Sequence, residues 1–409
     1  MRTMTRTAVA VAVLALAAAG CGRDDEPEGG GGGTSPGITE SDIKLGGSYP
    51  FSGPASAYAA IAQGAQARFA AENAKGGVDG RKITFKTLDD GYEPQRAVTN
   101  ARRLIEQEEV FALFNTLGTP NNLAIWDYVN QKKVPHLYVA TGASDFGEDL
   151  DKHPYTTGWQ PDYVSEAKSY AAYLKENKPS AKVAVLFQND GFGKDLLGGF
   201  EDAIEGSEIS IAARQSYEVT DPTITSQMRK LAGSGADTFL NITTPKFSAQ
   251  AIAAVAKSGW EPLHILNNVG SSKKLVLTPV GLENAKDIVS TGYFKDPEDP
   301  QWESDQTMRD YKAGMQEHQP KADPDEAYSA YGWTAASTMI EALKGMKEPN
   351  REALMESVRN MDAEIPLLLP GIKAQTSPTD GYPIQANQII KFNGENWETQ
   401  GEVVQTAEN

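Results

Sequence analysis

The chain has 409 residues, of which 55 are acidic and 38 are basic, and its formal net charge is −17. This acidic balance argues against nucleic-acid binding, because neutralising phosphates requires clustered Lys and Arg. Cys21 is the only cysteine, which excludes an intramolecular disulfide. A chain of this length exceeds what one hydrophobic core usually organises, so we expect two lobes.

Residues 1–20 have the pattern of a secretory signal peptide. Arg2 and Arg6 precede the apolar run AVAVAVLALA, and small residues then lead to Cys21. The run is too short for a membrane span, which takes roughly 20 apolar residues. The exit Ala18-Ala19-Gly20-Cys21 resembles a bacterial lipobox, with Ala18 in place of the usual Leu. It predicts cleavage before Cys21 and lipidation of its thiol.

Residues 21–39 are polar and Gly-rich without apolar periodicity, which predicts a disordered tether behind the lipid anchor. Loss of the leader, with its two arginines, makes the formal net charge −19. No second long apolar run follows. We therefore expect a lipoprotein on the outer face of the cytoplasmic membrane, which contacts the membrane through its anchor alone.

Short apolar runs alternate with stretches of helical periodicity from residue 43 on. Strands are predicted over residues 43–49, 83–88, 110–114, 135–139, 183–187, 209–217, 238–242, 263–267 and 288–293. Helices are predicted over residues 54–73, 94–107, 120–133, 162–177, 193–204, 224–232, 247–258, 301–317 and 328–344. The tail 366–397 is predicted to be extended or a hairpin. This alternation predicts the α/β class, with parallel sheets covered by helices.

The alternation breaks near residues 159–161 and then restarts, which predicts two doubly wound lobes joined by a hinge. No new run of strands follows residue 293, so the C-terminal third is expected to be shared between the lobes. The predicted domains are lobe 1, residues 40–159 plus 288–362, and lobe 2, residues 160–287 plus 363–409.

Ligands of open α/β sheets bind where strands end and loops lead into helix N-termini. The turn Leu117-Gly118-Thr119-Pro120 follows a buried strand, with Thr119 as the expected N-cap and Pro120 as the first helical residue. Free amides and the helix dipole at such a start favour an anion. Ordinary capping is the alternative explanation of this turn and of the similar Ser52-Gly53-Pro54.

Aromatic residues in or near these loops would supply apolar walls, as small-molecule pockets require. The candidates are Tyr58, Phe146, Trp159, Phe192 and Tyr293.

Catalytic motifs are missing from the sequence. The four histidines have no metal-ligand spacing, and there is no CxxC, HExxH, GxSxG or Walker loop. Gly191-Phe192-Gly193 begins like a dinucleotide fingerprint, but its third glycine would fall at Leu196. The sequence therefore predicts binding without catalysis, cofactor or metal.

The sequence resembles the Leu/Ile/Val-binding proteins of ABC importers, which have the type I periplasmic binding protein fold. The resemblance runs from about Ile43 onward and rests on SGPASAY, ENAKGGVDGRKI, LDDGYEPQRAV, KKVPHLYVATGAS and VAVLFQNDGFGKDLLGGF. It implies a monomer that closes two lobes on a small carboxylate and delivers this ligand to the permease subunits of an importer.

The resemblance also implies roles for individual residues. Leu117-Gly118-Thr119 matches the loop that binds the ligand carboxylate, and Gly142 and Ser144 match a second ligand-binding loop. Tyr58 matches a tyrosine of the pocket wall. Phe192 stands where the opposite lobe offers a tyrosine that closes over the ligand.

One position departs from the amino-acid binders of this family. They place an acidic residue against the ligand ammonium, where this chain has Asn268, and a buried ammonium without such a partner is costly. The segments GWQPDY and LFQNDGFGKD look more like a subgroup that takes aromatic or other hydrophobic acids. Two ligand classes therefore stay open, a branched-chain amino acid and an aromatic or hydrophobic acid. The alternative functions are a ligand-sensing receptor with the same cleft and an α/β hydrolase.

Overall fold

The computed structural model describes residues 35–405. The predicted signal peptide, Cys21 and most of the predicted tether lie outside these residues. The last residues of the predicted tether are ordered, which corrects its predicted end at residue 39. Ile38 is only 3% exposed and forms a bridge with Ile43, and Lys44 N donates to Gly37 O at 2.7 Å.

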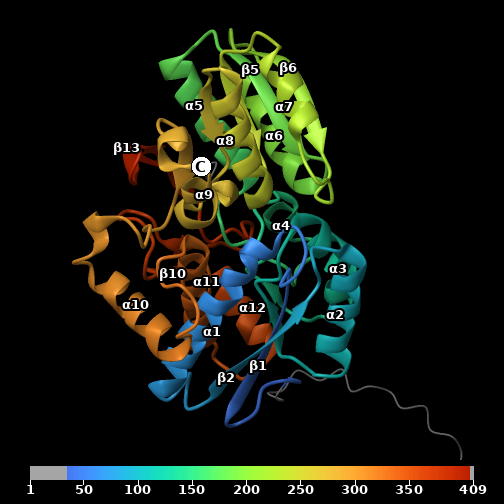
Figure 1. Ribbon diagram of the computed structural model, residues 1–409. Helices are drawn as coiled ribbons and strands as arrows, with labels where there is room; N and C mark the ends of the chain where they lie inside the picture. Colours follow the sequence, from blue (N-terminus) through green and yellow to red (C-terminus); the bar gives the residue numbers. More distant parts are fainter. Residues whose placement is uncertain (1–34, 406–409) are drawn as a thin grey trace, which may run out of the picture. The chain divides into compact units, whose positions relative to one another are not determined.

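A parallel four-stranded sheet in the order β2-β1-β3-β4 organises the first part of the chain (Figure 1). Its strands are β1 Asp42–Tyr49, β2 Lys82–Asp89, β3 Ala112–Phe114 and β4 His136–Leu137. The connecting helices are α1 Ala59–Ala74, α2 Pro94–Glu106 and α3 Thr119–Gln131. Because side chains alternate along a strand, Leu113 packs towards α2 and α3 while Phe114 packs towards α1.

A seven-stranded sheet in the order β13-β12-β9-β8-β7-β5-β6 organises the second part. Its strands are β5 Lys182–Gln188, β6 Ser210–Tyr217, β7 Thr238–Ile242, β8 Leu263–Leu266, β9 Val289–Gly292, β12 Ala386–Phe392 and β13 Trp397–Gln405. The first five are parallel, whereas β12 and β13 form the predicted hairpin and are antiparallel. The main helices are α5 Tyr163–Asn177, α6 Gly191–Ile204, α7 Thr225–Ala232 and α8 Pro245–Ser258.

Short elements fill the connections. They are α4 Asp145–Glu148, α9 Thr278–Val280, strands β10 Asp362–Ala363 and β11 Ala374–Gln375, a π-helix Lys273–Leu277, and 3₁₀ turns at Ser56–Tyr58, Asn268–Gly270, Leu282–Ala285 and Pro300–Trp302.

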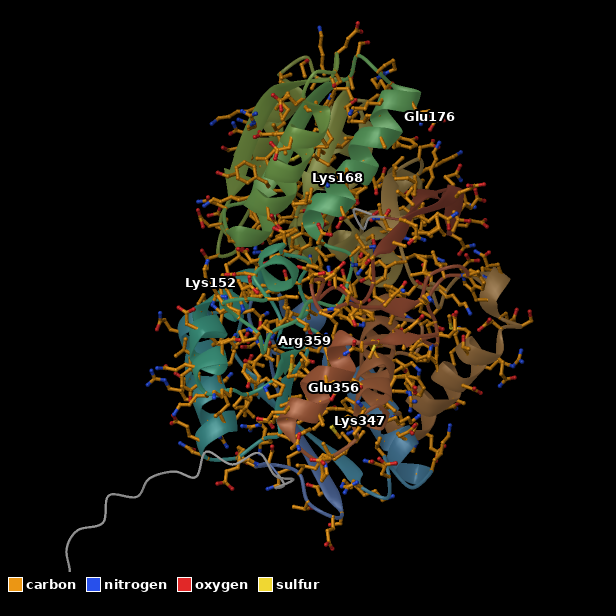
Figure 2. All side chains as sticks on the ribbon, turned by 180° about the vertical axis from the view of Figure 1, so that it is seen from behind. Lys152, Lys168, Glu176, Lys347, Glu356 and Arg359 are labelled. Atoms are coloured by element: carbon orange, nitrogen blue, oxygen red, sulfur yellow. The ribbon has the colours of Figure 1, made fainter. Side chains whose placement is uncertain are left out.

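The chain returns to the first sheet through α10 Gln306–His318, α11 Ala327–Lys344 and α12 Arg351–Arg359. Helix α12, which the sequence analysis did not predict, carries two of the charged residues labelled in Figure 2. Its Arg359 donates to the Pro154 carbonyl at 2.6 Å, and its Glu356 pairs with Lys347 at 2.6 Å. The first contact fixes the helix to the segment that leaves β4.

The predicted α/β class with parallel sheets is confirmed. One boundary differs, because β9, which the sequence assigned to lobe 1, pairs with β8 and β12 in the seven-stranded sheet. The other lobe boundaries stay a prediction. Below, lobe 1 means the four-stranded sheet with its helices and lobe 2 the seven-stranded sheet with its helices. Within residues 35–405, no helix combines the length and the apolar character that a membrane crossing needs.

Two glycines allow helices α1 and α11 to touch backbone to backbone. A Cβ atom on Gly64 would overlap the carbonyl oxygen of Ser329, and one on Gly332 would overlap that of Ile61. Tyr58, directly before α1, and Tyr328, in the first turn of α11, line the cavity described below. The glycine contact therefore sets the position of one cavity wall.

We expect Gly64→Ala to lower the free energy of unfolding by about 1–3 kcal/mol or more, because the added methyl overpacks the α1–α11 contact. Gly198→Ala in α6 is the matched control, since nothing lies within 4 Å of a Cβ there. Replacing a helical glycine by alanine in open space stabilises by up to about 1 kcal/mol. Urea unfolding followed by circular dichroism measures both variants, and equal midpoints would contradict the close contact.

Candidate functional site

A cavity opens where strands of both lobes end. Its walls are strongly aromatic. The aromatic lining residues are Tyr58, Tyr92, Tyr163, Phe192, Tyr293, Phe294, Tyr328 and Tyr331. Among the described residues that line this cavity, none has a charged side chain. An apolar cavity with a few neutral polar groups is typical of a small-molecule site.

Six of the eight ligand-binding residues named from the sequence line this cavity. They are Tyr58, Leu117, Gly118, Thr119, Phe192 and Asn268. The other two, Gly142 and Ser144, do not line it. The Gly142 carbonyl accepts from Tyr163 N at 2.6 Å, and the Ser144 amide and hydroxyl donate to Asp195 at 2.8 and 2.9 Å. These polar groups of the second loop are therefore engaged within the protein.

Helix α3 begins one residue earlier than predicted, with Gly118 as its N-cap and Thr119 as its first residue. The prediction of Thr119 as N-cap was wrong, because its hydroxyl pairs with Thr141 Oγ1 at 2.6 Å instead of capping the helix. Gly118 has φ 97°, a conformation that favours glycine. The amides of a first helical turn have no intrahelical acceptor and are free to donate to an anion.

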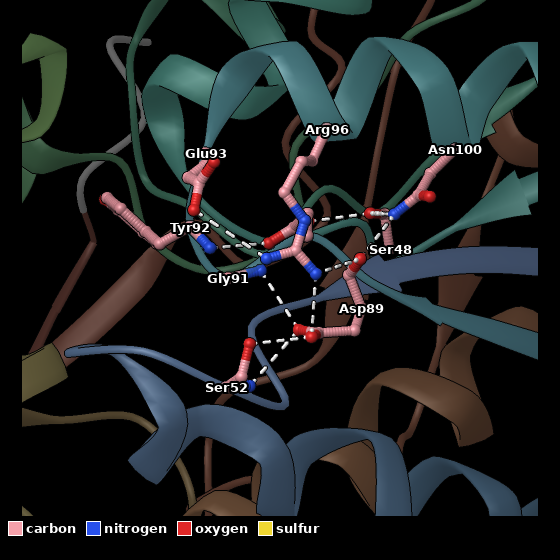
Figure 3. Close-up of polar contacts among 9 residues, drawn as sticks. Ser48, Ser52, Asp89, Gly91, Tyr92, Glu93, Arg96 and Asn100 are labelled. Atoms are coloured by element: carbon pink, nitrogen blue, oxygen red, sulfur yellow. Dashed lines mark hydrogen bonds and ion pairs between the residues drawn. The ribbon is translucent and has the colours of Figure 1, made fainter.

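A network around two aspartates shapes the loop after β2 (Figure 3). Asp89 accepts from Ser52 Oγ at 2.7 Å and from Arg96 at 2.8 Å. Asp90 is fully buried and accepts from Ser48 Oγ at 2.6 Å and from Tyr92 N at 2.8 Å. Burial raises the pKa of Asp90, and these donors oppose that rise. The network holds Tyr92 in a left-handed conformation, with φ 65°.

Tyr92 connects the two lobes, a role that the sequence analysis did not assign. Its ring packs so closely on Gly118 that a Cβ there would lie 2.7 Å from the ring. Its hydroxyl lies 3.5 Å from Asp190 Oδ2 and accepts from Gln188 Nε2 at 3.4 Å, and both partners belong to lobe 2. The only signal in the sequence was its place in the segment LDDGYEPQRAV.

Lobe 2 places a buried carboxylate behind the cavity wall rather than in it. Glu166 is 3% exposed, and its Oε1 accepts from Asn268 N at 2.7 Å and from Tyr170 OH at 2.7 Å. Burial raises the pKa of Glu166 to about 7. The Asn268 side chain donates to the Thr291 carbonyl. Asn268 thus stands between Glu166 and the cavity.

Comparison with known proteins agrees with this architecture. The family model described as periplasmic binding protein matches residues 42–396. The chain belongs to this family. Its members bind solutes, so the prediction of binding without catalysis is confirmed.

Relatives and solved structures cover most of the chain. The Leu/Ile/Val-binding protein homolog 7 of Brucella abortus is 25% identical over 337 residues, which are 79% of this chain and 82% of that protein. A branched chain amino acid ABC transporter structure from Thermus thermophilus with bound valine is similar with a TM-score of 0.81, at 16% identity, over 90% of this chain and 98% of that one. A solute binding protein from R. palustris in complex with 4-hydroxybenzoate has a TM-score of 0.76, at 18% identity, over 90% and 98%. The type I periplasmic binding protein fold is confirmed.

We expect Glu166→Gln to remove part of the pH dependence of stability. Because the pKa of Glu166 is about 7 in the folded protein and 4.5 ordinarily, the folded state alone holds a proton between these pH values. Stability therefore falls as pH rises through this window and levels off above it. Thermal unfolding from pH 5 to 8 should show a flatter profile for the variant.

Glu176→Gln is the control for this measurement. Glu176 is exposed near the C-terminal end of the same helix α5 (Figure 2), so its replacement should leave the profile unchanged. Parallel profiles for Glu166→Gln and the wild type would contradict the raised pKa.

Proposed function

We propose that this chain binds a small carboxylate between its lobes and delivers it to the membrane subunits of an ABC importer. The observation that carries the proposal is the position of the α3 start, with Gly118 and Thr119 lining a cavity that has aromatic walls. Membership in a family of solute-binding proteins supports it. No cofactor is required.

The carboxylate lies at the first turn of α3, where unpaired amides and the positive end of the helix dipole stabilise negative charge. Tyr58 and Tyr328 form one wall, with their rings 5.0 Å apart and edge to face. Both hydroxyls donate to the Val269 carbonyl of lobe 2, at 3.0 and 2.9 Å. Phe192 covers the opposite side.

Closing of the lobes would couple binding to delivery. Contacts that join the lobes stabilise the closed form. Besides the Tyr92 hydroxyl, Ser272 Oγ donates to Glu326 at 2.9 Å, and Ser144 donates to Asp195. A ligand that touches both lobes adds to these contacts and shifts the population towards the closed form. The importer would then recognise the closed rims.

The mature protein is a monomer, held at the outer face of the cytoplasmic membrane by a lipid on Cys21. Removal of the signal peptide would leave the acylated cysteine at the start of the tether, with the binding lobes beyond it. Metabolic labelling with a radioactive fatty acid tests this anchor. Label is expected in the full chain and is expected to be lost in Cys21→Ala, whereas an unlabelled full chain would contradict the anchor.

The binding proposal is tested by thermal unfolding with a panel of amino acids and unsubstituted carboxylic acids. At least one carboxylate should raise the unfolding temperature, as a ligand of the native state does. Gly118→Ala should abolish that response, because it adds a Cβ 2.7 Å from the Tyr92 ring at a φ that disfavours alanine.

Gly206→Ala is the matched control. Gly206 also has a positive φ, 70°, but nothing lies within 4 Å of a Cβ there and it does not line the cavity. This variant should be slightly less stable and keep its response to ligand. An unchanged response in Gly118→Ala would contradict the placement of the carboxylate.

A further inference from the structure

Most hydroxyl donors around the cavity are already engaged by the protein. Tyr58 and Tyr328 both donate to the Val269 carbonyl. Ser271 Oγ donates to the Asn268 carbonyl at 2.6 Å, and Ser272 Oγ donates to the buried Glu326 side chain. Each of these hydroxyls has a single proton, so none of them can donate a second hydrogen bond to a ligand.

Gln160 is different, because its amide has donors left over. It lines the cavity and is 3% exposed. Its Oε1 accepts from Tyr331 OH at 3.0 Å, which fixes the orientation of the side chain. Within residues 35–405, no acceptor pairs with its Nε2. An amide on a cavity wall that has no acceptor in the protein is free to donate to a ligand oxygen.

Tyr163 is another free donor, at the end of a chain of hydroxyl groups. The Thr141 hydroxyl donates to the Tyr163 hydroxyl oxygen at 3.3 Å. Because Thr141 has only one hydroxyl proton, Thr119 must be the donor in the hydrogen bond between Thr119 and Thr141. No acceptor for the Tyr163 proton lies within the described residues. Its ring packs on Phe192 at 5.1 Å, which holds the hydroxyl near Thr119. Burial raises the pKa of Tyr163 and keeps this proton in place.

Acceptors for an ammonium group are scarce on the same walls. Asn268 lines the cavity with a neutral side chain, and Glu166 behind it already receives two donors. The Gly142 carbonyl and the Ser144 hydroxyl are engaged by Tyr163 N and Asp195. Burying an ammonium here would leave a charge without a counter-ion.

We propose that the ligand is an apolar carboxylate without an α-ammonium group, and that the Gln160 amide and the Tyr163 hydroxyl hold its oxygens together with the first turn of α3. The inference rests on the proposed function and names the class of carboxylate. Three features favour an apolar carboxylate: the cavity has neutral donors without acceptors, its walls are aromatic, and it offers no counter-ion for an ammonium group. Gln160 and Tyr163 are thus specificity-determining residues for the site.

Matched ligand pairs test the missing ammonium on the unmodified protein. Isothermal titration compares 3-phenylpropanoate with L-phenylalanine and 4-methylpentanoate with L-leucine, which differ only in the amino group. At least one deaminated acid should bind ten times or more tightly than its amino acid. Tighter binding of the amino acid in both pairs would overturn this inference and leave the proposed function standing. Binding of no carboxylate in the pairs or in the wider panel would overturn both.

Two variants test the donors, using whichever acid of the pairs binds the wild type more tightly. Gln160→Glu keeps the size of the side chain and the acceptor for Tyr331, but it loses the free amide. Tyr163→Phe keeps the ring on Phe192 and loses the hydroxyl. Each should weaken binding of the acid at least tenfold. Tyr173→Phe, further along α5, is the control and should bind as the wild type does.

Folding of these variants is checked by their unfolding temperatures. Wild-type affinity in folded Gln160→Glu and Tyr163→Phe would contradict the assigned donors. The comparison of ligand pairs uses the wild-type protein alone. It can therefore still refute the inference if a variant fails to fold.

Discussion

The site depends on the close packing of the Tyr92 ring against the backbone of Gly118. Gly118 turns the chain from β3 into α3 with φ 97°, and the ring occupies the space that any side chain would need. This packing aims the first turn of α3 into the cavity. It also carries the Tyr92 hydroxyl to Gln188 and Asp190 of lobe 2. One contact thus links the proposed anion-binding turn to the proposed closing of the lobes.

The surrounding structure keeps that contact in place. The Asp89–Asp90 network holds the loop of Tyr92, and the glycine contact between α1 and α11 sets another wall of the cavity. Backbone approach of this kind is rigid, because no side chain can rotate to relieve it. The lobe 1 part of the cavity wall is therefore fixed before the lobes close, which lowers the entropy that binding must overcome.

Much of the fold could be predicted from the sequence, because apolar runs mark buried parallel strands. Strand β7 was predicted with its observed bounds, Thr238–Ile242. Helix α12 was not predicted, since Arg351–Arg359 is short and follows a polar stretch. The sheet to which β9 belongs could not be inferred, because neighbours within a sheet are set by tertiary packing rather than by local pattern.

The site was predictable only in part, for a related reason. The turn at Gly118 has a local signature, and Tyr58 and Phe192 lie in loops that the resemblance covers. The free donors of Gln160 and Tyr163 have no local signature, because they are free only when every neighbouring hydrogen bond is counted. The engagement of Ser144 by Asp195 likewise depends on residues 51 positions apart.

The most direct measurement is a crystal structure of the protein with the carboxylate that it binds most tightly. We expect a carboxylate oxygen at hydrogen-bond distance, about 2.7–3.2 Å, from the Thr119 amide nitrogen, with the apolar body between Tyr58 and Phe192. A ligand bound elsewhere, with no oxygen near the first turn of α3, would contradict this placement.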